Sequence, residues 1–191
     1  MRNEIAAVPS IPLIVASILS KKIAEGIDRL VMDVKWGLGA FMKTQEEAKH
    51  LASSLAQVGA HAGLHIRTVL TQTDEALGCA VGNALEVEES IACLKGEGPK
   101  DVRELVCLLS GDERAAQVLS SGAAYEVFAQ MVHAQGGDLN QPLRGGGTKE
   151  WTFCSPKEGI LRRSDAYNIG CLLYTSPSPR DATLSRMPSS A

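Results

Sequence analysis

The feature that most constrains the fold of this chain is the alternation of helical and strand-like apolar patterns in its first 71 residues. A helical apolar run begins at Pro12 and ends near Gly26, and residues 30–35 form a short β-prone run. A capping box at residues 44–47 starts a second amphipathic helix, and residues 65–71 have the pattern of another strand. Such alternation is typical of a βαβ unit in a parallel sheet, so we predict an α/β fold.

The composition excludes several classes of protein. The 191 residues are 45% hydrophobic but only 4% aromatic, which indicates one ordinary domain, or one and part of another, with an aliphatic core. The net charge of −3, with both signs interspersed, argues against nucleic acid or a membrane surface as the main partner. No stretch approaches the roughly 20 apolar residues of a membrane span. The five cysteines form no C-x-x-C pair, which favours reduced thiols in a cytoplasmic protein.

Residues 10–22, SIPLIVASILSKK, carry candidate ligand-binding groups on the first helix. Ser17 and Lys21 are four residues apart, so a helix projects them side by side. If the preceding segment folds back, Arg2 joins them in a cationic patch rich in hydrogen-bond donors. Such a patch suits a planar, oxygen-bearing ligand that gains negative charge while reacting. The spacing alone favours a simpler interpretation, a buried helix whose serine bonds the preceding turn and whose lysine faces water.

Two loops have compositions that suit ligand binding. Residues 36–41, WGLGAF, directly follow a strand, where α/β sheets place their sites, although two glycines more often only make a tight turn. Residues 77–82 form a small-residue loop, and Asn83 would cap a helix over 84–94 with glutamates in its first two turns. Acids there suit the helix dipole, and the functional alternative is a cation held by loop carbonyls and one carboxylate.

The second half of the chain is predicted to be helical at first. Helices are expected over 102–109, 112–120 and 123–135, followed by a glycine-rich linker. Residues 151–161 have the pattern of a β-hairpin. The Ser/Pro/Arg-rich end of the chain cannot bury a core and is expected to be disordered and non-native.

Three motifs, in order along the chain, resemble the thymidine/pyrimidine-nucleoside phosphorylase family. They are SIPLIVASILSKK, LVMDVKWGLGAFM and LGCAVGNALEVEES, at residues 10–22, 30–42 and 77–90. The resemblance implies a central α/β domain with a mixed parallel sheet and flanking helices, followed by the start of a small β-rich C-terminal domain. It also implies a cytoplasmic homodimer that salvages pyrimidines by phosphorolysis. The substrates would be thymidine alone, or thymidine together with uridine or deoxyuridine, with phosphate as co-substrate and no organic cofactor.

The resemblance also implies how the chain divides into parts, and that one segment of the family is missing from it. The family's glycine-rich phosphate-binding segment has no equivalent here, because the GGG at 145–147 lacks a strand before it and a helix after it. We therefore expect a fragment that opens at an internal methionine and is inactive, or nearly so, alone. The expected parts are a base-binding helical segment (1–26), part of the α/β domain (27–138), a linker (139–150), the start of the β-rich domain (151–170) and the tail (171–191).

By motif match, the family's base-holding residues fall on Arg2, Ser17 and Lys21. The resemblance implies that Arg2 and Lys21 are catalytic, because they donate to the ring carbonyl oxygens and neutralise the leaving base. Ser17 would bond a ring N–H or carbonyl. The apolar positions that match the surroundings of the base are Val8, Ile14 and Phe41; without the resemblance, each is simply a core residue.

Some relatives also hold a structural potassium ion. The resemblance maps its ligands to the carbonyls of Leu77 and Ala80 and to the carboxylate of Glu89. An alternative of a different class remains, a non-catalytic α/β module that uses the same cationic patch to bind another anion or base. Within the enzyme class, specificity for thymidine alone or for both thymidine and uridine is open.

Overall fold

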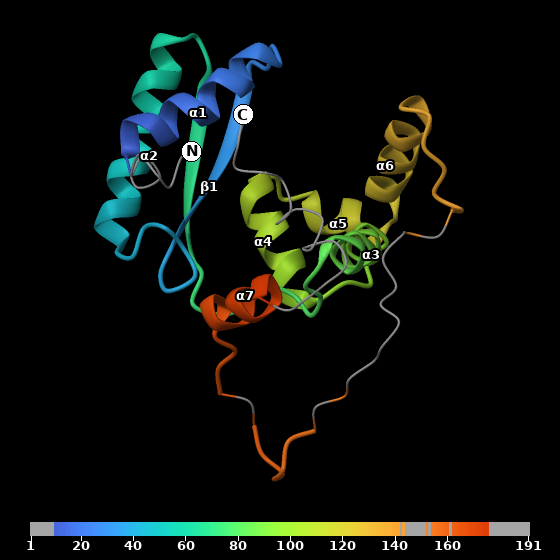
Figure 1. The fold of residues 1–191 in the computed structure, drawn as a ribbon. Coiled ribbons are helices and arrows are strands. Elements are labelled where there is room, and N and C mark those ends of the chain that lie inside the picture. The colour runs from blue at the N-terminus through green and yellow to red at the C-terminus, as the bar shows by residue number, and fades with distance from the viewer. Residues whose placement is uncertain (1–9, 142, 144–151, 153, 161, 176–191) are drawn as a thin grey trace, which may run out of the picture. The chain divides into compact units, whose positions relative to one another are not determined.

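The structure is a computed structural model that describes residues 10–141, 143, 152, 154–160 and 162–175. Arg2 and Val8 lie outside the described residues, as do most of the predicted linker and residues 176–191 of the predicted tail. The chain divides into two compact units (Figure 1). Unit 1 comprises the chain up to Ala76 together with the segment after Ile160, and unit 2 comprises Leu77–Ile160.

Unit 1 is built on the predicted βαβ unit. Strand β1 (Arg29–Trp36) is followed by helix α2 (Gln45–His61) and strand β2 (His65–Gln72). The two strands pair in parallel along their whole length, from Arg29 opposite His65 to Trp36 opposite Gln72. The α/β prediction is thereby confirmed, and both strands fall where the sequence placed them.

Local signals explain where the helices of unit 1 begin and end. Helix α1 (Ile11–Ala24) begins after Ser10, with Pro12 in its first turn, where the proline's missing N–H costs no hydrogen bond. It ends just before Gly26, whose φ of +70° stops the helix. Helix α2 begins at the complete predicted capping box, in which Thr44 and Glu47 each accept from the other's backbone N–H.

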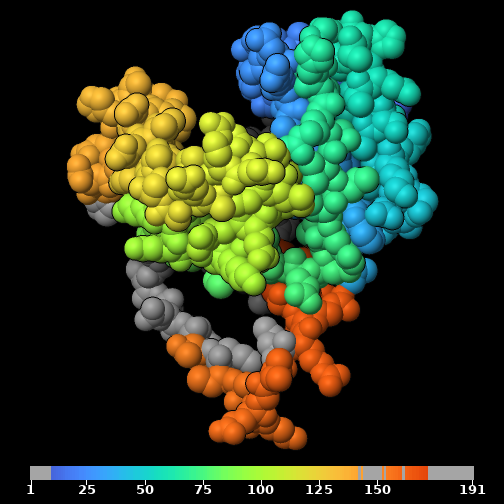
Figure 2. Space-filling model, turned by 180° about the vertical axis from the view of Figure 1, so that it is seen from behind, coloured from blue at the N-terminus to red at the C-terminus, as the bar shows by residue number. Residues whose placement is uncertain are grey.

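The core of unit 1 lies on one face of the β1–β2 sheet (Figure 1). Alternate residues of β1 point to this face because strand side chains alternate. Helices α1 and α2 both pack there, and Leu19 and Leu55 are their most completely buried large side chains. The buried residues of this cluster are Val15, Leu19, Val34, Met42, Ala48, Leu51, Ala52, Leu55 and Leu64. Seen from behind, atoms of α2 and β2, cyan to green, cover much of unit 1 (Figure 2).

Unit 2 consists of four helices among its described residues. They are α3 (Asn83–Leu94), α4 (Lys100–Ser110), α5 (Ala115–Ser120) and α6 (Ala123–Ala134). The three helices predicted beyond residue 100 are confirmed with shifted ends. The predicted cap at Asn83 was wrong, because Gly82 occupies the N-cap position and Asn83 is already helical.

The segment after the linker differs from the prediction. No described residue of the predicted hairpin at 151–161 lies in a strand, and Ile160 is 92% exposed. A two-stranded hairpin needs a packing partner, and Pro156 removes a ladder donor, which accounts for the difference. Helix α7 (Ala166–Thr175) follows instead, so Cys171–Thr175 are helical and not part of a disordered tail. Asp165 precedes α7, and its carboxylate accepts from the Asn168 N–H at 3.0 Å, a capping signal that the sequence contains.

Within the described part of the chain, no helix combines the length and the apolar character needed to cross a membrane.

Candidate functional site

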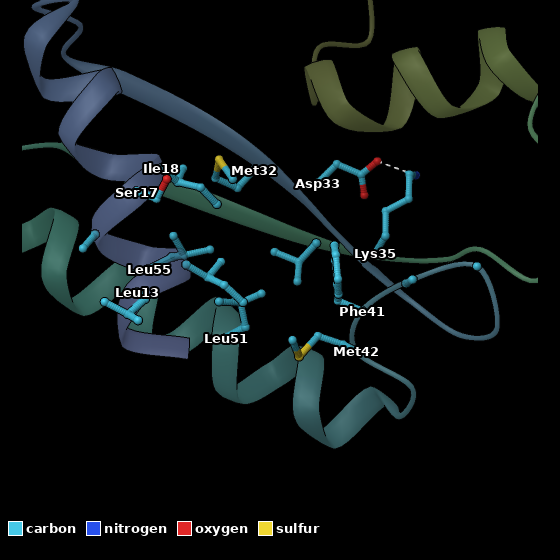
Figure 3. Close-up of a pocket in the computed structure, with 15 residues that line it drawn as sticks. Leu13, Ser17, Ile18, Met32, Asp33, Lys35, Phe41, Met42, Leu51 and Leu55 are labelled. Atoms are coloured by element: carbon cyan, nitrogen blue, oxygen red, sulfur yellow. Dashed lines mark hydrogen bonds and ion pairs between the residues drawn. The ribbon is translucent and has the colours of Figure 1, made fainter. Parts of the chain in front are cut away.

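Unit 1 contains a cavity of about 870 Å³ between α1, α2, β1 and the loop after β1. Its walls are mostly aliphatic, and Ser17 on α1 is the polar predicted site residue that lines it. Figure 3 shows Leu13, Leu51 and Leu55 gathered on the helical side. A concave, largely apolar space with few polar groups is the usual form of a small-molecule site. The residues that line it are Leu13, Ile14, Ala16, Ser17, Ile18, Met32, Asp33, Val34, Lys35, Gly39, Ala40, Phe41, Met42, Leu51 and Leu55.

The structure places Ser17 and Lys21 next to each other on α1. Lys21 Nζ donates to Ser17 Oγ at 3.2 Å and to the Ser17 carbonyl oxygen at 2.8 Å. The ammonium therefore lies against the turn that carries the hydroxyl, and of these two residues Ser17 lines the cavity. Lys22 points elsewhere, since its Nζ pairs with Glu25 at 3.0 Å. The two predicted donors, Ser17 and Lys21, are therefore in direct contact in unit 1.

The apolar site residues lie in different environments. Ile14 is half-buried, lines the cavity and packs against the core cluster. Phe41 also lines the cavity but is 73% exposed, which is unusual for a phenylalanine that serves only the core. An exposed ring at a cavity wall is available to stack against a planar ligand.

The glycine-containing loop at 36–41 is held by the chain that follows β2. Asp74 Oδ1 accepts from the Leu38 N–H, and the Thr73 carbonyl accepts from the Gly39 N–H, both at 2.8 Å. Hydrogen bonds to the Asp74 carboxylate, first from the Leu38 N–H and then from the Gln72 side chain, lower the pKa of Asp74 below its ordinary value. A Cβ added at Gly39 would lie 2.8 Å from the Thr73 oxygen, so this glycine permits close approach of protein backbone. In the structure, the backbone that approaches Gly39 closely is that of Thr73.

A charged cluster on β1 was not among the predicted site residues. Lys35 Nζ donates to Asp33 Oδ2 at 2.6 Å and to Thr71 Oγ1 at 3.0 Å, and the Thr71 hydroxyl donates to Asp33. The Asp33 side chain is only 18% exposed. Figure 3 shows Asp33 and Lys35 pointing toward each other and away from the leucines of α2. The signal was two opposite charges at i and i+2 on a strand, but their threonine partner follows only from the register with β2.

In unit 2, two carboxylates bind the backbone of the loop at residues 77–80. Glu89 Oε1 accepts from the Cys79 N–H at 2.7 Å, and Asp101 Oδ2 accepts from the Gly78 N–H at 2.8 Å. A Cβ at Gly78 would collide with the Glu89 carboxylate, so the acid lies directly against the loop. The structure therefore brings Glu89 to the segment that contains Leu77 and Ala80. Asp101 was missed because it is distant in sequence from that loop.

The potassium set inferred from the resemblance suits a hard monovalent ion in its donor chemistry. It consists of one carboxylate and two backbone carbonyls, and hard cations prefer oxygen ligands. Among the residues that the structure describes, no group of three or more His, Cys, Asp or Glu side chains is placed to hold a metal ion.

Comparison with known proteins bears on the same residues. The model of the glycosyl transferase family, a/b domain, matches residues 2–132. A thymidine phosphorylase of Mycobacterium tuberculosis is 42% identical over 179 residues, which cover 89% of this chain and 42% of that protein. A pyrimidine-nucleoside phosphorylase of Bacillus subtilis is 44% identical over 153 residues, and one of Staphylococcus aureus is 43% identical over 153 residues. Each of these two alignments covers 72% of this chain and 35% of the relative.

This chain thus spans less than half the length of these curated relatives. The family model, by contrast, matches more than half of the chain and covers α1, the βαβ unit and most of unit 2. The chain therefore belongs to the glycosyl transferase family, through its a/b domain.

Proposed function

We propose that the protein carrying this chain is a pentosyltransferase that performs phosphorolysis of pyrimidine nucleosides. It would convert thymidine, and uridine or deoxyuridine as well if its specificity is broad, with phosphate to the free base and a pentose 1-phosphate. The relatives support this proposal, because they are named thymidine phosphorylase and pyrimidine-nucleoside phosphorylase. The observation in this chain that carries it is the contact of the Lys21 ammonium with Ser17, a residue that lines an apolar cavity.

The chemistry of the reaction explains why these donors matter. The bond between the pentose C1′ and the ring nitrogen breaks, its electron pair leaves with the base, and a phosphate oxygen bonds to C1′. The ring therefore gains negative charge, much of it on its carbonyl oxygens. The Lys21 ammonium and the Ser17 hydroxyl would stabilise that charge more than the neutral ground state, which lowers the barrier. Arg2 is proposed as the third donor, and removal of one such donor costs about 10²-fold or more in rate.

The proposal extends to the partners of the whole protein. Its substrates would be a pyrimidine nucleoside and phosphate, and its structural ion would be potassium at Leu77, Ala80 and Glu89. It would act as a cytoplasmic homodimer, as the resemblance implies. For the 191-residue chain itself we propose binding of the free base with little or no turnover, because its sequence contains no glycine-rich phosphate-binding segment.

Binding of free bases to the chain tests the proposal directly. The melting temperature is measured with thymine, uracil, sulfate and acetate, and base affinity is then measured by calorimetry. We expect thymine or uracil to raise the melting temperature and the two anions to leave it unchanged. Equal stabilisation by unrelated anions would favour the non-catalytic anion-binding module.

Substitution of two neighbouring lysines distinguishes base binding at a specific site from a general effect of positive charge. Lys21→Met should weaken base binding about tenfold to hundredfold, because it removes a hydrogen bond from a charged donor. Lys22→Met is the control, since this neighbouring lysine pairs with Glu25 and should leave affinity unchanged. A phosphorolysis assay with thymidine and uridine completes the test, and clear turnover by this chain would overturn the proposed inactivity.

A further inference from the structure

The loop that follows β1 forms one wall of the 870 Å³ cavity. We call its residues, 37–43, the β1 loop, and four of them line that space: Gly39, Ala40, Phe41 and Met42. The Phe41 side chain is 73% exposed, so burial does not fix its ring in place. The position of this ring at the cavity wall therefore depends on what holds the backbone of the β1 loop.

Helix α7 contacts the β1 loop from a distant part of the chain. Its first residue, Ala166, donates its N–H to the carbonyl of Asp74, whose carboxylate binds the Leu38 N–H of the loop. A Cβ added at Gly39 would lie 3.1 Å from the Ala166 Cβ, so the start of α7 lies directly against the loop. The same segment that binds the loop therefore also binds α7.

Lys43 connects the β1 loop with two helices. Its Nζ donates to the Leu38 carbonyl at 3.0 Å and lies 5.7 Å from the centroid of the Tyr167 ring on α7. Its backbone N–H donates to the Glu47 carboxylate in the cap of α2 at 2.7 Å. A cation within about 6 Å of a ring centroid is attracted to the face of the ring. The Lys43 ammonium thus links the loop's own carbonyl to an aromatic ring of α7.

We propose that α7 is a clamp on the β1 loop, with Lys43 and Tyr167 as its positioning residues. Neither of these two is among the described residues that line the cavity, so both act through the loop. A loop that is ordered before its ligand arrives loses less conformational entropy on binding. The clamp therefore strengthens the binding of a ligand that contacts Phe41. This effect on affinity rests on the proposed function, whereas the order of the loop does not.

Amide hydrogen exchange, measured by nuclear magnetic resonance on the intact 191-residue chain, tests the clamp without a ligand. The probes are the N–H groups of Leu38 and Gly39. Tyr167→Leu removes the ring and should accelerate their exchange about threefold, whereas Tyr167→Phe keeps the ring and should retain the wild-type rate. Tyr125→Leu is the matched control, because Tyr125 forms a cation–π pair with Lys95 in unit 2, at 4.6 Å. Unchanged exchange in Tyr167→Leu, or equal acceleration by Tyr125→Leu, would overturn the proposal.

A larger side chain at the start of α7 gives a second readout. Ala166→Leu places bulk where the helix meets Gly39, and it should accelerate exchange of the Gly39 N–H about tenfold or more. Gly170→Leu is the control on the same helix, since nothing lies within 4 Å of a Cβ added there. Equal rates in the two variants would show that α7 does not hold the loop.

Thymine affinity then distinguishes the clamp from the proposed function. Calorimetry should show binding weakened about threefold in Tyr167→Leu and retained in Tyr167→Phe, in parallel with the exchange rates. A wild-type chain that binds no thymine would contradict the proposed function, while the exchange rates would still decide whether α7 clamps the loop. Wild-type affinity in a Tyr167→Leu chain whose loop exchanges faster would overturn the inference that the clamp acts on the site.

Discussion

At the scale of single residues, the conformation of the loop after β1 depends on Gly39, which has no side chain, and on the carboxylate of Asp74. Gly39 gives its N–H to the Thr73 carbonyl, and Leu38 gives its N–H to Asp74. Lys43 adds a bond from its Nζ to the Leu38 carbonyl at 3.0 Å. Since Phe41 and Met42 of this loop line the cavity, the bonds to Thr73 and Asp74 also set the shape of the candidate site.

Substitution of Gly39 by alanine should destabilise unit 1. The new Cβ would lie 2.8 Å from the Thr73 carbonyl oxygen, which is backbone and cannot move aside cheaply. We expect a loss of about 1–3 kcal/mol in the free energy of unfolding, measured by urea denaturation. Gly170→Ala is the matched control in α7: nothing lies within 4 Å of its added Cβ, so we expect a gain of about 0.5–1 kcal/mol. Two substitutions of equal effect would contradict the steric argument.

Asp74 should make stability depend on pH in the acid range. Its folded-state pKa is lowered, first by the Leu38 N–H, so the charged carboxylate favours the folded state. This contribution is fully present above the unfolded pKa of about 4 and is lost as pH falls through the lower folded pKa. In Asp74→Asn, the stability measured by urea unfolding at pH 5 and pH 3 should therefore fall less than in the wild type. Parallel losses in the two proteins would show that the carboxylate has no such role.

At the scale of secondary-structure elements, α2 is the helix whose start is most fully specified by sequence. Thr44 accepts from the Glu47 N–H at 3.2 Å, while Glu47 Oε2 accepts from the N–H groups of Thr44 and Lys43 at 3.1 and 2.7 Å. The helix then buries Ala48, Leu51, Ala52 and Leu55 against the sheet. The cap therefore stabilises the element on which the core of unit 1 is assembled.

Loss of the cap should be measurable in the intact chain. Thr44→Ala is expected to lower the free energy of unfolding by about 1 kcal/mol, because a helix N–H loses its partner. Ser54→Ala on the same helix is the control, since its hydroxyl only donates to the His50 carbonyl of the preceding turn. A Thr44 variant as stable as the Ser54 variant would argue that water satisfies the helix start equally well.

The elements of unit 1 could be predicted because their signals are local. Apolar periodicity and caps located α1, α2 and both strands, and the spacing of Ser17 and Lys21 implied their contact. Interactions that depend on the three-dimensional path could not be predicted. The Asp33–Lys35–Thr71 cluster needs the register of β1 with β2, and Asp101 reaches Gly78 only after α4 has packed. The missed helix α7 is a different case, since Asp165 was available as a cap but the resemblance favoured β structure.

At the scale of the whole molecule, the cysteines of unit 2 report on whether that unit is folded. Cys93 is buried, whereas Cys79 and Cys154 are exposed. Burial raises the pKa of the Cys93 thiol, and the nearby Glu89 carboxylate adds to the shift. Since the thiolate is the reactive form, this cysteine should react slowly as long as unit 2 is folded.

Alkylation kinetics test this expectation. With iodoacetamide at pH 8 and mass spectrometry of the peptides, Cys93 should be modified about tenfold or more slowly than Cys79 or Cys154. In urea the three rates should converge, because unfolding exposes the buried thiol. Rapid labelling of Cys93 under native conditions would mean that unit 2 opens readily on its own.

The residues at the start of α7 contact the segment of unit 1 that directly precedes unit 2 in the chain. Glu75 forms an antiparallel bridge with Asp165, and the Ala166 N–H donates to the Asp74 carbonyl at 3.2 Å. The four-helix unit is thus an insertion whose two connections leave one site on the βαβ scaffold. Joining ends that are already adjacent costs little chain entropy. Evolution or protein engineering could therefore replace Leu77–Ile160 by another module, or by a short turn, and leave the fold of unit 1 intact.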